Sequence, residues 1–193
     1  MDQSNGYEGI ATRFIAIRGR NIDCIGTSSV RNWTRTLPPS STVLDLGCGT
    51  GLPIAKVLVD EGMTVYGLDA SATLVHEFRQ NFPKAPVACE PVEDSVFFNR
   101  KFDAIICWGL IFLLSTEVQA KVIGKAADAL RTGGKLLFTA PDQQTEWEDV
   151  MTNQPSRSLG ADEYKKLLSA SGLTLVEEFE DEGENHYFSA MKI

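Results

Sequence analysis

Two kinds of hydrophobic pattern alternate along this chain. In some segments apolar residues follow one another in short runs, as in buried strands, and in others they recur every three or four residues, as on one helix face. The strand-like segments are residues 42–47, 64–69, 86–92, 102–108, 135–140, 173–180 and 186–193. The helix-like segments begin at Leu52, Ser71, Ser115 and Ala161, and they are expected to end at Gly62, Pro83, Gly133–Gly134 and Gly172.

The order of these segments predicts an α/β fold. Strands that are separated by helices of about ten or more residues form right-handed crossovers, and hence a parallel sheet with helices on both faces. The last two strands differ, because the short polar turn at residues 181–185 can join them only as an antiparallel hairpin. We therefore expect a doubly wound sheet of seven strands, mostly parallel, with a C-terminal antiparallel hairpin.

The part of the chain before the first strand has its own pattern. Apolar residues from Tyr7 to Ile15 share one face of a helix, and the sequence PPSS at residues 38–41 separates this part from the first strand. A length of 193 residues fits one domain. We predict a single domain at residues 1–193, in which residues 1–41 form a helical extension or lid and residues 42–193 form the core.

Composition restricts the function classes. Hydrophobic residues make up 43% and charged residues 23% of the chain, which is typical of soluble globular proteins and excludes a disordered chain. The net charge of −8 disfavours a nucleic-acid partner, because such partners require a basic face. The longest apolar run, residues 104–114, is shorter than the roughly 20 residues of a membrane span, and we expect no membrane association.

The four cysteines give the expected compartment. Cys24, Cys48, Cys89 and Cys107 are widely separated and form no CxxC pair, which argues against a zinc site or a redox dithiol. The start of the chain has no signal-peptide pattern. We expect a reducing, cytoplasmic location and no metal.

The most informative segment is VLDLGCGTG at residues 43–51, where a strand turns into a helix. Gly47, Gly49 and Gly51 lie in that turn. Glycine allows a positive φ, and it lets a ligand approach the backbone without meeting a Cβ atom. A loop of this kind at the carboxyl end of a parallel strand suits a nucleotide-like ligand.

Two cofactor classes compete for this loop. Dinucleotide folds use the spacing G-x-G-x-x-G, and its third glycine lets the helix pack under a pyrophosphate. This chain has G-x-G-x-G, with Leu52 at the position of that third glycine. Asp69, at the end of the second strand, can accept both hydroxyls of a ribose from either cofactor. Asp45 discriminates, because its charge beside the loop repels a pyrophosphate and attracts a cation.

Four motifs in order, VLDLGCGTG, VYGLDAS, FDAIICWG and LRTGGKLLFTAP, resemble those of class I S-adenosylmethionine-dependent methyltransferases. The resemblance covers residues 42–193, including the closing hairpin. It implies a Rossmann-like version of the sheet predicted above, with S-adenosyl-L-methionine as the cofactor. It further implies an enzyme that transfers a methyl group.

The resemblance also implies where the cofactor binds. The methionine part is expected beside Asp45, Gly47, Cys48, Gly49 and Gly51, and the ribose beside Asp69, Ala70 and Ser71. The adenine is expected beside Val92 and Glu93, and the methyl-transfer region beside Trp108 and Gly109. Cys48 is interpreted as a small loop residue rather than a nucleophile. Pro91 stands where many relatives have an aspartate that accepts from the adenine amino group. Glu90, Glu93, Asp94 or a backbone carbonyl must therefore replace it.

The acceptor side is less well defined. Methyl transfer from a sulfonium depends mainly on alignment of the reacting atoms, and it needs a general base only if the acceptor proton has a high pKa. His186 and Tyr7 are the candidate catalytic residues: His186 follows the turn at residues 181–185, and Tyr7 resembles a tyrosine that relatives place on a lid helix. For His186 a surface position is an equal alternative. Gln143, Gln144 and Trp147 are expected in the wall, and the acidic residues 177–184 are interpreted as a solvated edge and turn.

Three functions remain open from the sequence. The leading hypothesis is a methyltransferase that acts on a small-molecule acceptor, because the core carries about forty leading residues and no further recognition domain. A nicotinamide-dependent reductase is opposed by the glycine spacing. A cofactor-binding protein without catalysis is the third. The atom that is methylated and the oligomeric state are not indicated by any motif.

Overall fold

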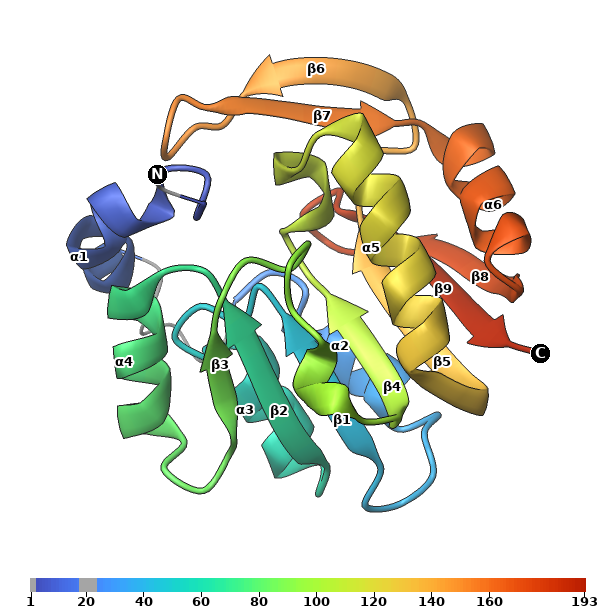
Figure 1. Cartoon of the computed structure of the whole chain (residues 1–193), viewed down its shortest axis with the longest axis horizontal. Helices are drawn as coiled ribbons and strands as arrows, with labels where there is room; N and C mark the ends of the chain where they lie inside the picture. The colour runs from blue at the N-terminus through green and yellow to red at the C-terminus, as the bar shows by residue number, and fades with distance from the viewer. Residues whose placement is uncertain (1–2, 18–23) are drawn as a thin grey trace.

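The computed structural model describes residues 3–17 and 24–193, and it contains a central seven-stranded sheet with strand order β3-β2-β1-β4-β5-β9-β8 (Figure 1). The strands are β1 (Thr42–Leu46), β2 (Thr64–Asp69), β3 (Val87–Cys89), β4 (Phe102–Cys107), β5 (Leu130–Thr139), β8 (Leu173–Glu180) and β9 (His186–Lys192). β1 to β5 pair in parallel, and β9 is antiparallel to both β5 and β8. The predicted α/β fold with its closing hairpin is confirmed.

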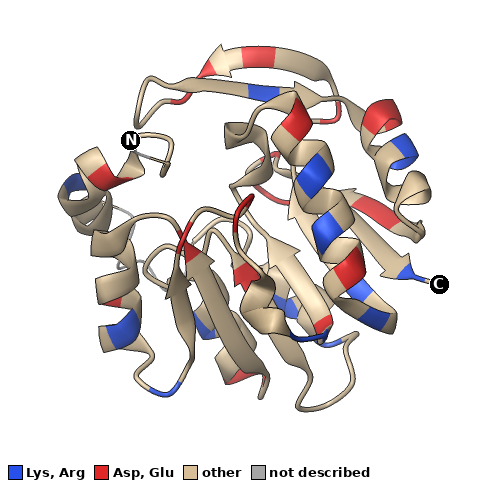
Figure 2. Ribbon diagram, viewed as in Figure 1, with Lys and Arg blue, Asp and Glu red and all other residues tan. Residues whose placement is uncertain are grey.

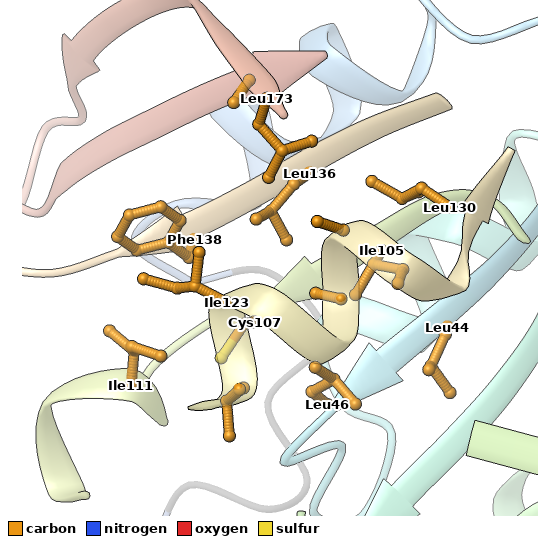
Figure 3. Close-up of a cluster of buried hydrophobic side chains, with 14 of the residues drawn as sticks. Leu44, Leu46, Ile105, Cys107, Ile111, Ile123, Leu130, Leu136, Phe138 and Leu173 are labelled. Carbon is orange, nitrogen blue, oxygen red and sulfur yellow. The ribbon is translucent and has the colours of Figure 1, made fainter. Parts of the chain in front are cut away.

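Helices cover both faces of the sheet, each over its own hydrophobic core. α2 (Thr27–Thr34), α3 (Ile54–Asp60) and α4 (Ala72–Asn81) contribute side chains to one core. α5 (Thr116–Ala129) and α6 (Ala161–Ala170) cover the opposite face, and Figure 3 shows side chains of α5 and the strands packed together there. β4 lies between the two cores, which explains why its sequence is almost entirely apolar.

The helix starts follow the predicted capping residues. Ser71 Oγ accepts a hydrogen bond from the Leu74 N–H at the start of α4, and Ser115 Oγ accepts one from the Val118 N–H at the start of α5. α3 begins at Ile54, two residues after Leu52, because Pro53 occupies its N-cap position. Within residues 3–17 and 24–193, no helix is long and apolar enough to cross a bilayer.

The front of the chain packs against α4. In α1 (Tyr7–Ile17), Ala11 and Ile15 are buried against Leu74 of α4, as the apolar pattern predicts. Glu8 of the same helix accepts from the hydroxyls of Ser71 and Thr73, so polar contacts also fix α1 to the start of α4.

A second, two-stranded sheet was not predicted. β6 (Gln144–Glu148) and β7 (Pro155–Leu159) form an antiparallel hairpin that lies above the carboxyl ends of the main strands in Figure 1. The sequence places Gln143, Gln144 and Trp147 in the cavity wall but predicts no strand there. Most of β6 is exposed and polar, so it lacks the apolar run by which the other strands were found.

Two strand boundaries also differ from the prediction. The third strand spans only Val87–Cys89 instead of residues 86–92, since Pro91 has no N–H and its carbonyl accepts from Ser95 in a turn. Gly133 and Gly134 do not end the preceding helix; they lie within β5, where pairing with β4 changes register. Gly133 has a φ of 78°, so these glycines allow the irregular strand.

Candidate functional site

One cavity of about 490 Å³ lies at the carboxyl ends of the parallel strands, where α/β sheets bind ligands. It is lined by β-strand ends, by α1, by the β6–β7 hairpin and by the turn between β8 and β9. Of the residues predicted from the sequence, those that line it are Tyr7, Asp45, Gly47, Cys48, Gly49, Asp69, Ala70, Val92, Glu93, Trp108, Gly109 and His186. The fold therefore brings together residues from both ends of the chain.

Two of the predicted binding residues do not line the cavity. Gly51 lies behind the loop, where an added Cβ would come within 2.4 Å of Phe82 Cε2. Ser71 is fully buried, caps α4 and donates to Glu8 Oε2 at 2.5 Å. Both residues shape the wall from behind, since one allows the turn and the other holds the helix that follows Asp69.

Most N–H groups of the glycine loop, residues 47–51, already donate hydrogen bonds to other groups of the protein. The N–H groups of Gly47 and Cys48 donate to Leu68 O at 2.8 and 3.0 Å, and the Gly49 N–H donates to Asp69 Oδ2 at 2.9 Å. The Gly51 N–H donates to Cys48 O at 2.8 Å. A phosphate-binding loop instead directs free N–H groups at its ligand. The loop geometry thus favours a cation over a pyrophosphate.

Asp45 is the least satisfied polar group of this wall. Its side chain is only 2% exposed, and Oδ2 has no hydrogen-bond partner among the described residues. Burial, together with the nearby Asp69 carboxylate, raises the pKa of Asp45 well above its usual range. A cationic ligand in the cavity would provide the missing partner and favour the ionised form.

Asp69 has a structural role in addition to the predicted contact with a ribose. Its Oδ1 accepts from the Ser71 N–H at 2.8 Å, and its Oδ2 accepts from the Gly49 N–H. Burial raises the pKa of Asp69, although these backbone hydrogen bonds oppose the shift. The carboxylate therefore links the glycine loop to the start of α4 while it lines the cavity.

Cys48 is buried and packed, in agreement with its interpretation as a small loop residue. Its Sγ would lie 2.8 Å from a Cβ placed on Gly67, so the thiol fills the space above that glycine. Burial, followed by the charges of Asp45 and Asp69, raises the pKa of the Cys48 thiol well above its usual value. The nucleophilic thiolate form is correspondingly disfavoured.

The segment expected beside adenine is held by a lysine from the opposite face. Lys125 of α5 donates from Nζ to the carbonyl oxygens of Val92 and Glu93 at 3.0 and 2.9 Å. Burial lowers the pKa of Lys125. Glu90 and Glu93 both line the cavity, whereas Asp94 does not, so two of the three proposed substitutes for an aspartate at Pro91 are suitably placed.

Trp108, just after β4, is fixed by a chain of hydrogen bonds. Its Nε1 donates to Tyr187 OH at 2.9 Å, and Tyr187 OH donates to Asp181 Oδ2 at 2.7 Å. The neighbouring Gly109 N–H donates to Thr139 Oγ1 at 2.9 Å. The indole ring is therefore held by Tyr187, and the backbone beside it by Thr139, in the cavity wall.

Tyr7 connects the N-terminal helix to the β6–β7 hairpin across the cavity. Its hydroxyl donates to Asp149 Oδ2 at 3.3 Å, and its ring packs edge-to-face on Phe14 with centroids 5.7 Å apart. Asp149 Oδ1 in turn accepts from the N–H groups of Met151 and Thr152. No sequence signal pointed to Asp149, because it acts through a contact 142 residues away from Tyr7.

His186 lines the cavity between two carboxylates. Its Nε2 is 3.3 Å from Glu178 Oε2, and its Nδ1 is 3.6 Å from Glu180 Oε1, beyond hydrogen-bond range. Burial opposes ionisation of Glu178, but Lys165 and His186 outweigh it and lower the pKa of that carboxyl. An ionised Glu178 only accepts hydrogen bonds, so His186 Nε2 is the donor in this contact, and Nδ1 has no hydrogen-bond partner among the described residues.

A family model described as a methyltransferase domain matches residues 26–178. The chain belongs to this methyltransferase-domain family. The resemblance to a methyltransferase family seen in the four motifs is thereby confirmed.

Two curated proteins are similar to this chain in sequence. An uncharacterized methyltransferase from Anoxybacillus flavithermus is 31% identical over 103 residues, which cover 51% of this chain and 46% of that protein. A tRNA U34 carboxymethyltransferase from Campylobacter fetus subsp. fetus is 28% identical over 120 residues, which cover 60% of this chain and 42% of that protein. The chain thus spans less than half the length of these relatives.

A solved methyltransferase structure shares the whole fold. Magnesium protoporphyrin IX methyltransferase from Synechocystis PCC 6803, solved with bound S-adenosylmethionine, matches with a TM-score of 0.73 and 17% identity over 100% of this chain and 98% of that chain. The match supports the S-adenosylmethionine-dependent methyltransferase fold for this member of the family.

Some residues in the remaining walls of the cavity were not predicted from the sequence, and others were predicted to lie elsewhere. Phe112 and Trp147 form an aromatic pair with centroids 5.5 Å apart, and both line the cavity. Of the three wall residues expected after β5, only Trp147 does so, because Gln143 and Gln144 are exposed outside it. Glu180 and Glu184, interpreted as part of a solvated edge, are exposed and also line the cavity.

Proposed function

We propose that this chain binds S-adenosyl-L-methionine and transfers its methyl group to a small-molecule acceptor. The observation that carries the proposal is Asp45, a buried carboxylate with an unpartnered oxygen in the cavity. Beside it, the N–H groups of Gly47, Cys48, Gly49 and Gly51 in the glycine loop are engaged by the protein. Such a wall stabilises positive charge. S-adenosylmethionine carries a sulfonium and an ammonium group, whereas a nicotinamide dinucleotide would place a pyrophosphate there.

The predicted cofactor residues fit this ligand. Asp45 would hold the cationic methionine part, and Asp69 would accept from the ribose hydroxyls through lone pairs that its backbone contacts leave free. Val92 and Glu93 would lie beside the adenine, with Lys125 fixing their carbonyls. The cofactor supplies a methyl group already activated by positive sulfur, so the protein needs mainly to align the acceptor.

Three features of the protein serve that alignment. Trp108 is fixed by Tyr187 and presents a rigid surface in the middle of the cavity. α1 brings Tyr7 over the cavity as a lid. His186 can accept a proton from the acceptor through Nδ1 while Glu178 orients its ring. Tyr7 is accordingly proposed as a closing residue and His186 as the candidate base.

The charge of the cavity supports a small acceptor over a nucleic acid. Among residues 3–17 and 24–193, those that line the cavity include no lysine or arginine, and its walls carry several carboxylates. Nucleic-acid sites need cations to neutralise phosphates. The similarity to a tRNA U34 carboxymethyltransferase makes tRNA the second candidate acceptor, so it is included in the test.

Calorimetric titration with S-adenosylhomocysteine and with NADH tests the cofactor. We expect S-adenosylhomocysteine to bind and NADH not to bind, and binding of NADH alone would refute the proposal. Methyl-labelled S-adenosylmethionine is then supplied with a metabolite panel or with a tRNA pool. Label in a small molecule is the expected result. Label only in tRNA would establish the second candidate, and no transfer to either would leave a binding protein without catalysis.

A further inference from the structure

The charged side chains that line the cavity are acidic, apart from His186. Figure 2 shows acidic ribbon segments near the carboxyl edge of the sheet, whereas α5, on the outside, carries both basic and acidic segments. One acid, Asp149, has both oxygens engaged by protein donors. Asp45, Asp69, Glu90 and Glu93 belong to the proposed cofactor contacts.

Three carboxylates are left over: those of Asp142, Glu180 and Glu184. In the described part of the chain none of them pairs with a lysine or arginine, and only Glu180 has a histidine, His186, within 4 Å. Asp142 and Glu184 have no ion pair within the same residues. The cavity thus has more negative charge than a cofactor with a net charge of about +1 compensates.

A buried polar atom accompanies these acidic residues. His186 lines the cavity, and its Nδ1 is buried and has no hydrogen-bond partner among the described residues. Glu180 Oε1 is 3.6 Å from that nitrogen, beyond hydrogen-bond range. Asp45 Oδ2, in the same cavity, also has no hydrogen-bond partner among these residues.

An ammonium group is the ligand chemistry that answers this pattern. It has positive charge and several N–H donors, and it has no acceptor that would compete. A carboxylate or a phosphate would meet only negative charge and lone pairs. A neutral hydroxyl could donate one hydrogen bond but would leave the charge uncompensated.

The aromatic wall indicates what the rest of the ligand resembles. Phe112 and Trp147 present two rings at an interplanar angle of 45°, and Leu110, Leu113 and Leu114 also line the cavity. Such a surface binds an apolar or aromatic body, and the face of Trp147 can additionally attract a cation.

We propose that the methyl acceptor is an amine that binds as its ammonium form and has an apolar body. Its ammonium group lies between His186 Nδ1 and the carboxylates of Glu180 and Glu184, and its body lies against Phe112 and Trp147. One ammonium proton passes to His186 Nδ1, the freed nitrogen lone pair forms the new N–CH3 bond, and the S–CH3 bond breaks to leave S-adenosylhomocysteine. This inference rests on the proposed methyltransferase function, and it specifies the class of substrate that the same cavity accepts.

Three probes of the same shape and different charge test the proposal. Phenethylamine, 2-phenylethanol and phenylacetate are titrated by calorimetry into the protein saturated with S-adenosylhomocysteine. We expect phenethylamine to bind at least about tenfold more tightly than the alcohol, and phenylacetate not to bind. Equal or tighter binding of the alcohol or the acid would overturn the proposal, as would failure of all three.

The double variant Glu180→Gln, Glu184→Gln tests the contact itself. Exposed charge pairs are individually weak, so we expect about a three- to tenfold loss of phenethylamine affinity with no change for 2-phenylethanol. Glu177→Gln removes the same charge from the exposed part of β8 outside the cavity and should change neither. An unchanged amine affinity in the double variant would contradict the assignment.

The saturation step separates the two proposals. If S-adenosylhomocysteine fails to bind, the methyltransferase function is wrong and the amine experiment is not reached. If it binds and the probes fail as described, only the amine class is wrong.

Discussion

The two sides of the cavity differ in how far the protein satisfies their polar groups. The glycine loop has its N–H groups bonded to Leu68, Asp69 and Cys48, and it leaves one buried oxygen of Asp45 without a partner. The turn between β8 and β9 instead presents exposed carboxylates, Glu180 and Glu184, and the unpartnered Nδ1 of His186. We therefore expect the glycine loop to suit one fixed ligand. Because Glu180 and Glu184 are exposed, we expect substitutions at these positions to leave the fold unchanged.

If that comparison is correct, the largest effect should come from the backbone behind the glycine loop. Gly51→Ala places a Cβ within 2.4 Å of Phe82 at a φ of 81° and should lower the free energy of unfolding by about 2–4 kcal/mol. Gly62→Ala is the matched control, because its φ is 80° and nothing lies within 4 Å. Urea unfolding should show a loss of about 1–2 kcal/mol there. Equal losses would mean that packing behind the loop is unimportant.

The next effect concerns the unpartnered charge. Asp45→Asn should weaken S-adenosylmethionine binding about 10- to 100-fold, because a charged contact is lost. The pKa of Asp45 is raised in the folded state, so its contribution to stability is greatest at acidic pH and falls as pH rises through that pKa. The ligand-free variant should therefore unfold at a higher temperature than the parent near neutral pH.

Calorimetry checks the predicted loss of S-adenosylmethionine affinity in Asp45→Asn. Thermal unfolding from about pH 5 to pH 8 checks the predicted change in stability. Asp60→Asn changes an exposed acid in α3 and serves as the control. A variant that binds S-adenosylmethionine as well as the parent would show that Asp45 does not hold the cation.

The smallest expected effect is at the contact that crosses the cavity. Tyr7→Phe removes the hydrogen bond to Asp149 and should speed dissociation of S-adenosylhomocysteine about three- to tenfold, since one neutral-to-charged hydrogen bond is lost. Stopped-flow displacement measures the rate. Tyr66→Phe, on a strand outside the cavity, should leave it unchanged. If both variants behave alike, α1 does not close over the ligand.

What the sequence predicted well was local. The glycine loop, Asp45 and Asp69 lie within a continuous strand-turn-helix-strand segment, so spacing along the chain determined their positions. The same holds for the caps of Ser71 and Ser115 and for the buried face of α1.

What it did not predict depends on contacts between distant segments. β6 and β7 have few apolar residues and are recognisable only through their pairing with each other. Asp149 gains its role from Tyr7 at the other end of the chain, and Ser71 was placed in the binding site although its hydroxyl is used by Glu8 and the helix cap. Glu180 ends β8 and Glu184 lies in the polar turn that follows, so the sequence alone suggests solvated side chains. Only the folded structure shows that both residues line the cavity.

The turn between β8 and β9 also offers a route to redesign. Asp181 fixes its shape by accepting from Gly183, Asn185 and Tyr187, and a Cβ added to Gly183 would displace the Ile25 side chain. Residue 184 protrudes from this rigid frame into the cavity. Libraries restricted to that position and to Glu180 would explore new substrates while the frame, and through it Trp108, keeps its geometry.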